Sequence, residues 1–169
     1  MSRKWPRDIR KKYALESIRR GEFVAKSVSS FCRSINEAKV LDIGCGEGGI
    51  SIAFAKKASE VYAIDIVLEG IERSKIRAKE QAAEVNFIIA DGLRVPFGAN
   101  VFDIVICNDL IEHVPDPSRL MSEIYRILRR QGVLFLSTPN SISPYQIVHD
   151  SHYSLFGVSL MPRSMAKYY

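Results

Sequence analysis

The sequence predicts an α/β domain in which helices cover both faces of a mostly parallel sheet. Five short apolar runs of strand type alternate with helical stretches, which is the pattern of repeated strand–helix–strand units. The chain has 169 residues, 47% of them hydrophobic and 25% charged, so its composition is globular and its length allows a core. No stretch approaches the roughly 18 consecutive apolar residues of a membrane helix. We expect a single domain over residues 1–169.

A helical lead-in over residues 1–36 precedes the first strand. Between Pro6 and Cys32 apolar residues recur at helical spacing, which predicts one amphipathic helix or a pair broken near Gly21. The expected core spans residues 37–140. Its predicted strands lie at residues 40–44, 61–66, 85–90, 101–107 and 133–138, and its predicted helices at residues 48–58, 68–82 and 117–129.

Positive charge is concentrated at the N-terminal end of the chain. Residues 1–26 carry nine Lys or Arg against three acids, a net charge of +6, whereas the other 143 residues carry −1. Such a segment fits either a solvated helix face or a surface for nucleic acid or acidic membrane. It contains no known nucleic-acid module and no interleaved aromatic platform, so a nucleic-acid partner is not expected.

Targeting signals and cysteine usage point to one compartment. No apolar run follows the basic N-terminus, so neither a signal peptide nor a membrane anchor is predicted. Cys32, Cys45 and Cys107 form no C-x-x-C pair, and we expect them to be reduced rather than joined in disulfides. These observations predict a cytoplasmic protein.

A glycine-rich loop follows the first predicted strand and opens the next helix. Gly44, Gly46 and Gly49 give the spacing G-x-G-x-x-G, which permits a tight turn and a close approach of backbone N–H groups to a ligand. The same spacing is the dinucleotide fingerprint, and Asp65 at the end of the next strand can bind a ribose in either case. The glycines alone therefore leave an NAD(P)-dependent oxidoreductase open.

Two acids beside the loop favour a ligand without phosphate. Asp42 lies two residues before Gly44 and Glu47 lies within the turn, so two carboxylates flank the position of a doubly negative pyrophosphate. Like charges at that range are unfavourable by about a kcal/mol or more. S-adenosylmethionine, which carries an ammonium, a sulfonium and a ribose, suits this loop better.

Four motifs in order resemble those of the class I S-adenosylmethionine-dependent methyltransferases, within the group that includes the ubiquinone and menaquinone biosynthesis methyltransferases. They cover roughly residues 38–140 and are Val40–Gly48, Val61–Ile66, Ala90–Phe97, and Phe102–Asn108 running into Ile111–Val114. The resemblance implies a Rossmann-like doubly wound sheet of strand order 3-2-1-4-5. It also implies methyl transfer from S-adenosyl-L-methionine to an oxygen, nitrogen or carbon of a small acceptor.

The resemblance carries cofactor-binding roles over to this chain residue by residue. In the family the loop cradles the methionine end, an acid at the position of Asp65 takes both ribose hydroxyls, and an acid at Asp91 reaches the adenine amino group. Asp42 and Asp91 can alternatively bind backbone amides in turns. Cys45 fits a packing role better than a nucleophilic one, because no base stands near it in the sequence. The predicted cofactor set is Asp42, Gly44, Cys45, Gly46, Asp65, Ile66, Asp91, Gly92 and Asn108.

Three residues of metal-ligand type follow the fourth predicted strand. Asp109, Glu112 and His113 stand at i, i+3 and i+4, so on a helical turn they can face one point. The spacing resembles the E-x-x-E-H set of metal-dependent O-methyltransferases, but Asp replaces the first Glu and shortens that ligand. We therefore expect no metal and take His113 as a candidate catalytic residue. His152, with His149 nearby, is the second candidate, as a general base, a fourth metal ligand or an ordinary surface residue.

The expected sheet is shorter than that of the family. The family fold normally adds a sixth and a seventh strand, for which residues 141–169 are too few, so this segment is expected to form only part of the acceptor side. Either the chain is a fragment, or a second subunit, as in a homodimer, covers the open edge of strand 5. A non-catalytic or truncated S-adenosylmethionine-binding protein is therefore the alternative to an active enzyme.

Overall fold

The computed structural model of the chain describes residues 7–139, and the side chains of residues 15–139. In this part five strands form one sheet in the order β3-β2-β1-β4-β5, and each neighbouring pair is parallel. The predicted α/β class and strand order are thereby confirmed. The strands are β1 (Lys39–Ile43), β2 (Glu60–Asp65), β3 (Asn86–Ile89), β4 (Phe102–Asn108) and β5 (Leu128–Ser137).

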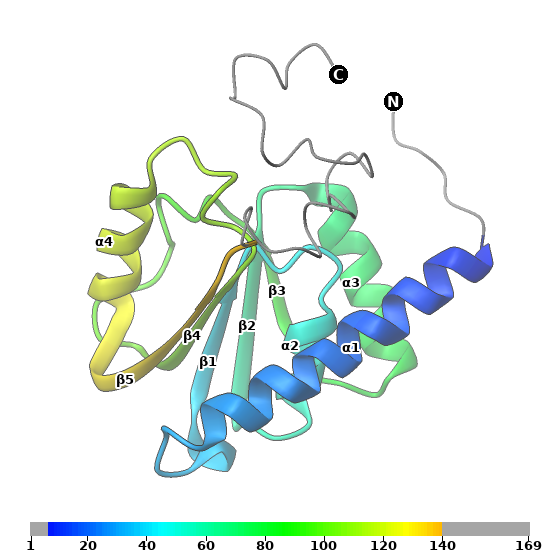
Figure 1. The fold of residues 1–169 in the computed structure, drawn as a ribbon, viewed down its shortest axis with the longest axis horizontal. Coiled ribbons are helices and arrows are strands. Elements are labelled where there is room, and N and C mark those ends of the chain that lie inside the picture. The colour runs from blue at the N-terminus through cyan, green and yellow to red at the C-terminus, as the bar shows by residue number, and fades with distance from the viewer. Residues whose placement is uncertain (1–6, 140–169) are drawn as a thin grey trace. The chain divides into compact units, whose positions relative to one another are not determined.

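Helices cover both faces of this sheet. α4 lies on one side, and α1, α2 and α3 lie on the other, as Figure 1 shows. α2, α3 and α4 each connect one strand to the next parallel strand, as parallel pairing requires. The helices are α1 (Arg7–Ser29), the short 3-10 helix η1 (Ile35–Glu37), α2 (Gly49–Ala55), α3 (Leu68–Glu80) and α4 (Pro117–Ile127).

The core divides into clusters on the two faces of the sheet. The cluster shared with α4 includes Leu41, Ile43, Val105, Leu120, Ile124 and Ile127. The cluster shared with α1 and α2 includes Val24, Val28, Val40, Phe54, Ile104 and Ile106. Neighbouring residues of β1 and β4 thus alternate between the clusters, which is the period of two expected of a strand. Burial on both faces explains why these strands are almost continuously apolar.

α1 is one continuous helix, so the alternative break at Gly21 does not occur. Gly21 lies where α1 packs on α2. A Cβ added to it would lie 2.7 Å from the Cβ of Ala53 and 2.7 Å from the Cα of Ile50. The missing side chain therefore lets the two helices approach closely, which outweighs the low helix propensity of glycine.

β5 begins earlier than the sequence pattern predicts. The apolar run predicts a strand over residues 133–138, whereas β5 starts at Leu128, directly after α4. Its first part is irregular: the pairing with β4 shifts register between Phe102 and Ile104, and Gln131 has φ 68°. Because residues 129–131 are exposed and polar, this stretch has no apolar alternation by which a strand can be recognised.

Two sequence-based expectations concern the C-terminal part of the chain. The single domain expected over residues 1–169 stays a prediction, because residues 140–169 are not among those that the structure describes. The acceptor-side segment at residues 141–169 lies outside the described residues.

Across residues 7–139, none of the helices combines the length and the hydropathy needed to cross a bilayer.

Candidate functional site

A cavity of about 220 Å³ lies at the carboxyl ends of β1 and β4. The glycine loop after β1, the helix α1 and the end of β4 form its walls. β1 and β4 are the neighbours at which the strand order reverses, and ligands of open α/β sheets bind at that point. The lining residues are Ser17, Arg20, Asp42, Gly44, Cys45, Gly46, Glu47, Gly49, Ile50, Asn108 and Asp109.

The glycine loop is held in a sharp turn by the neighbouring strand. The backbone N–H groups of Gly44 and Cys45 both donate to the carbonyl of Ile64, at 2.8 and 3.0 Å. Gly46 has φ 53°, and no heavy atom lies within 4 Å of a Cβ placed on it. The side of Gly46 on which a Cβ would stand is therefore open, and a ligand can approach it closely.

Asp65 ends β2 beside the open side of the loop. Its Oδ2 accepts from the N–H of Gly46 at 2.8 Å, and its Oδ1 accepts from the N–H of Val67 at 2.8 Å. These bonds fix the carboxylate and leave each oxygen a further lone pair. The next residue, Ile66, is 69% exposed. A fixed carboxylate next to an uncovered apolar side chain can accept from two hydroxyls and contact a flat ring.

Asp91 and Gly92 follow β3 at the same edge of the sheet. The Oδ1 of Asp91 accepts from the N–H of Leu93 at 2.8 Å, which is the Asx-turn that the sequence left open beside a ligand role. The residue is nevertheless exposed, so a ligand can reach its carboxylate. A Cβ on Gly92 would lie 2.9 Å from Cγ2 of Ile43, so packing against β1 requires glycine there.

Asp42 is the buried acid of the cavity. It is 2% exposed, and its Oδ2 accepts from the hydroxyl of Ser51 at 2.5 Å. Burial raises the pKa of Asp42 to about 6; the hydrogen bonds from Ser51 oppose the rise, and the charge of Asp65 adds to it. The ionised form of this buried acid lowers the stability of the folded state. Acids with perturbed pKa values in clefts are typical of functional sites.

Glu47 is held by two arginines of α3. Its Oε2 lies 2.5 Å from Nη2 of Arg77 and its Oε1 lies 3.2 Å from Nε of Arg73. Arg77 also donates to the Glu47 carbonyl at 2.8 Å. Glu47 is therefore not the free negative charge expected from the sequence, because the two cations remove most of its repulsion of a phosphate. The electrostatic case against a pyrophosphate therefore depends on Asp42.

The cysteines are free thiols. Burial, together with the charges of Asp42 and Asp65, raises the pKa of the Cys45 thiol above its ordinary value. Because the thiolate is the nucleophilic form, this environment disfavours nucleophilic chemistry at Cys45. Cys45 lines the cavity as a small neutral side chain.

Asp109 is bonded to α1 and β5. Its Oδ2 accepts from Nη2 of Arg20 at 2.6 Å, and its Oδ1 accepts from the Ser137 hydroxyl at 2.9 Å. Ser137 is equally close to Oδ1 of Asn108, so its single proton is shared between the two acceptors. These contacts connect α1, β4 and β5 at the edge of the cavity.

The structure separates the predicted metal-type set. Asp109 has φ 51°, and residues 111–113 form a turn rather than a helix, so the helical spacing assumed for the three residues does not apply. Among the residues that the structure describes, no group of three or more His, Cys, Asp or Glu can hold a metal ion. His113 is exposed on this turn and is not among the residues lining the cavity. His149 and His152 lie outside the described residues.

Sequence reasoning missed the side chains that hold the acids. Ser51 sits on α2, Arg77 on α3 and Arg20 on α1, and each bonds an acid of the cavity from a different element. In the sequence, Arg20 is distinguishable only as one of the cations of the basic segment. No fixed spacing relates these pairs, so only the packing of the helices brings them together.

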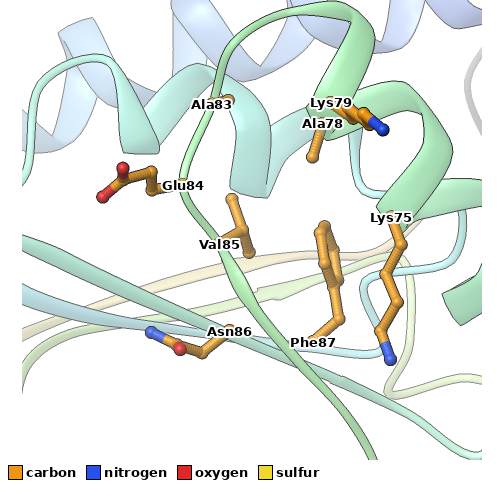
Figure 2. Close-up of a pocket in the computed structure, with 8 residues that line it drawn as sticks. All are labelled: Lys75, Ala78, Lys79, Ala83, Glu84, Val85, Asn86 and Phe87. Atoms are coloured by element: carbon orange, nitrogen blue, oxygen red, sulfur yellow. The ribbon is translucent and has the colours of Figure 1, made fainter.

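A second hollow, of about 410 Å³, lies between α3 and the edge strand β3. Figure 2 shows Lys75, Ala78 and Lys79 on the helix and Phe87 pointing toward it from the strand. The four polar residues that line it are all exposed, and the side-chain amide of one of them, Asn86, already donates to the carbonyl of Val61 at 3.3 Å. We assign no function to this hollow.

Known proteins share this sequence pattern and this fold. Residues 41–136 match the methyltransferase domain family. The ubiquinone biosynthesis O-methyltransferase of Histophilus somni is 36% identical over 111 residues, which are 63% of this chain and 47% of the relative. That of Psychrobacter cryohalolentis is 30% identical over 136 residues, which are 78% of this chain and 52% of the relative.

Solved structures show the same fold. The YcgJ protein of Bacillus subtilis has a TM-score of 0.61 at 28% identity, over 70% of this chain and 48% of that chain. A SAM dependent methyltransferase from Aquifex aeolicus has a TM-score of 0.56 at 21% identity, over 62% of this chain and 57% of that chain. This chain spans about half the length of the curated relatives it matches. Because the family match covers more than half of the chain and extends from β1 into β5, the chain belongs to the methyltransferase domain family, which implies S-adenosylmethionine as the methyl donor.

Proposed function

We propose that this chain forms the cofactor-binding part of an S-adenosylmethionine-dependent methyltransferase that acts on a small-molecule acceptor. The observation that carries the proposal is the fixed carboxylate of Asp65 beside the open Cβ side of Gly46. Membership of the methyltransferase domain family supports the same cofactor. The acceptor atom is an oxygen, nitrogen or carbon.

The nucleoside half of the cofactor fits the acids at the strand ends. The remaining lone pairs of Asp65 can accept from both ribose hydroxyls, and Asp91 can accept from the adenine amino group. The exposed side chain of Ile66 offers an apolar surface for the adenine ring.

The amino-acid half of the cofactor fits the cavity. Asp42 and Arg20 both line it and carry opposite charges, as an ammonium and a carboxylate require. The uncovered side of Gly46 leaves space for the chain that joins the two halves. The donor set therefore suits a ligand with a ribose, an amino acid and no phosphate.

The protein contributes orientation more than chemistry. When bound, the cofactor supplies an activated methyl group on its sulfonium. Asp42 and Asn108 border the space that the methionine end would fill, and the contact between Arg20 and Asp109 holds α1 across it. Most of the rate can come from aligning the acceptor with this methyl group. We propose His113 as the group that takes the proton of an acceptor that arrives protonated, with His152 as the second candidate.

The acceptor class follows from the relatives. They are named ubiquinone biosynthesis O-methyltransferases, so we propose a hydroxyl oxygen of a small molecule as the first acceptor to test. A screen of hydroxylated aromatic compounds with this chain, reading out the demethylated cofactor, tests it. Tight cofactor binding without turnover on any acceptor would favour the alternative of a non-catalytic cofactor-binding protein.

Cofactor choice is tested by titration of the folded chain. S-adenosylmethionine and its demethylated product should release heat in calorimetry and raise the melting temperature, because a ligand that binds only the folded state stabilises it. NADH in the same assay tests the oxidoreductase alternative and should give no signal. Absence of heat with millimolar S-adenosylmethionine would contradict the proposal.

We also propose a homodimer formed through β5. Within the described residues β5 pairs only with β4, and Leu136 on it is 42% exposed, so its outer edge can pair with another strand. Light scattering after gel filtration tests this, and a monomeric mass at micromolar concentration would refute it.

The free thiols support a reducing compartment such as the cytoplasm.

A further inference from the structure

The outer face of α1 has no role in the proposed reaction. The inner face packs Val24 and Val28 into the core, and Ser17 and Arg20 line the cofactor cavity. The opposite side of the helix carries Leu15, Arg19, Phe23 and Lys26, all four exposed, and the exposed acids Glu16 and Glu22 flank these four residues. Their spacing of i, i+4, i+8 and i+11 places them on one side of an α-helix. We call these four residues the outer stripe.

The outer stripe mixes large apolar side chains with cations. Leu15 is 53% exposed and Phe23 is 69% exposed. Single exposed apolar residues are ordinary on a protein surface. Two of them in line with Arg19 and Lys26 form the pattern of helices that lie in a membrane interface, where long basic side chains reach the headgroups while apolar side chains enter the acyl boundary.

The pattern continues beyond the helix. Phe31 is 79% exposed, and Arg33 two residues later is exposed as well. Beside α1 a hollow of about 530 Å³ is lined by Lys26 and by Lys57, which follows α2. Two lysines from separate elements thus border one concave surface, together with Glu22, Ala25, Ser29 and Ile35.

Charge selects among the possible occupants of this face. Residues 1–26 have a net charge of +6, of which residues 1–14 contribute +5 and residues 15–26 contribute +1. A second copy of the chain would bring two positive surfaces together. A nucleic acid would contact the cations but leave Leu15 and Phe23 without an apolar environment. An anionic lipid surface satisfies the cations and the apolar side chains together.

We propose that the outer stripe docks this protein on the surface of a bilayer that contains anionic phospholipids. The helix lies on the bilayer and does not cross it, in agreement with the lack of a spanning helix among the described residues. Because Arg20 and Ser17 occupy the other side of α1, docking leaves the cofactor cavity uncovered. Lipid binding and cofactor binding are therefore separable, and the proposal does not depend on the proposed reaction.

Co-sedimentation of the full chain with vesicles tests the proposal. We expect binding to vesicles of phosphatidylcholine with about 30% phosphatidylglycerol, little binding to phosphatidylcholine alone, and a strong decrease in 0.5 M salt. Leu15→Ser with Phe23→Ser should weaken binding about tenfold or more through the lost apolar burial. Arg19→Glu with Lys26→Glu should weaken it at least about twentyfold, since each lost cation is worth about fivefold.

The helix α3 offers matched control positions. Ile76 is 63% exposed, and Lys75 and Lys79 are exposed on the same helix. Ile76→Ser and the pair Lys75→Glu with Lys79→Glu repeat the two chemical changes away from α1, and each should keep vesicle binding within about twofold. Cofactor calorimetry and the melting temperature of each variant report whether the fold is intact. If the double apolar variant does not fold, Phe23→Ser alone replaces it.

Three results would overturn the proposal. One is no binding to the anionic vesicles at low salt. Another is an equal loss of binding in the α1 and α3 charge variants, which would indicate attraction by net charge alone. The third is binding to a duplex RNA or DNA, in place of vesicles, that depends on Arg19 and Lys26 but not on Leu15 and Phe23.

Discussion

Replacing Asp42 by asparagine is expected to stabilise the fold at neutral pH while weakening cofactor binding. Burial raises the pKa of this acid from 3.8 to about 6. The folded state therefore binds the proton more tightly than the unfolded state, so the stability contribution is full below pH 3.8 and is lost as the pH rises through 6. At about 1.4 kcal/mol per pKa unit, the ionised form costs about 3 kcal/mol at pH 7.

Asparagine removes this cost but introduces another. Its side-chain carbonyl can still accept from the hydroxyl of Ser51, which lies 2.5 Å from Oδ2 of Asp42. Its amide group adds two donors in a site where Asp42 is only 2% exposed, and burying them offsets part of the gain. We expect a net increase of about 1–3 kcal/mol in the free energy of unfolding at pH 7. Near pH 4 the gain should vanish.

Urea unfolding of both proteins at pH 7.5 and pH 4 measures this difference. Asp91→Asn is the matched control, since the same chemical change at an exposed acid should alter the unfolding midpoint little. Calorimetry with S-adenosylmethionine should show weaker binding to Asp42→Asn, because the ammonium loses a charged partner. If the free energies of unfolding of the parent and Asp42→Asn differ equally at both pH values, the reasoning from burial is refuted.

Four further outcomes follow from the site and its supports. Asp65→Ala should weaken cofactor binding by about 1.5–3 kcal/mol with an unchanged circular dichroism spectrum, and an unaltered dissociation constant would show that the ribose role is misassigned. Cofactor affinity should fall as the pH drops through about 6, because Asp42 takes up a proton, and a flat calorimetric profile from pH 5 to 8 would speak against this. Gly21→Ala should lower the free energy of unfolding by about 1–2 kcal/mol despite the better helix propensity of alanine, because the added methyl meets Ala53; a raised urea midpoint would show that the helices can separate. Chelation with EDTA should leave cofactor affinity unchanged, whereas a magnesium-dependent rise of several degrees in melting temperature that disappears in His113→Ala would indicate a metal site after all.

The fold could be predicted because its signals are local. Apolar runs of strand type and the glycine loop between two of them indicate a parallel α/β sheet without any knowledge of tertiary contacts. The irregular start of β5 could not be predicted, since Arg129 and Arg130 interrupt the apolar pattern between Leu128 and Val133, the two residues at which pairing to β4 stops and resumes. The continuity of α1 through Gly21 also depends on a partner helix that the sequence does not identify.

Charges at the site could be located from the sequence, but their partners could not. Glu47 is bonded to α3, Asp109 to α1, and Asp42 to two neutral groups of Ser51, its hydroxyl and its backbone N–H, among the hydrogen bonds described. Because Glu47 is paired with arginines, the repulsion of a phosphate that the sequence predicts from two acids comes mainly from Asp42. Burial of Asp42 compensates for the loss of the second unpaired carboxylate, since a carboxylate interacts more strongly with a charged ligand where water is excluded. The preference of this cavity for a cationic ligand therefore depends chiefly on the protonation state of Asp42.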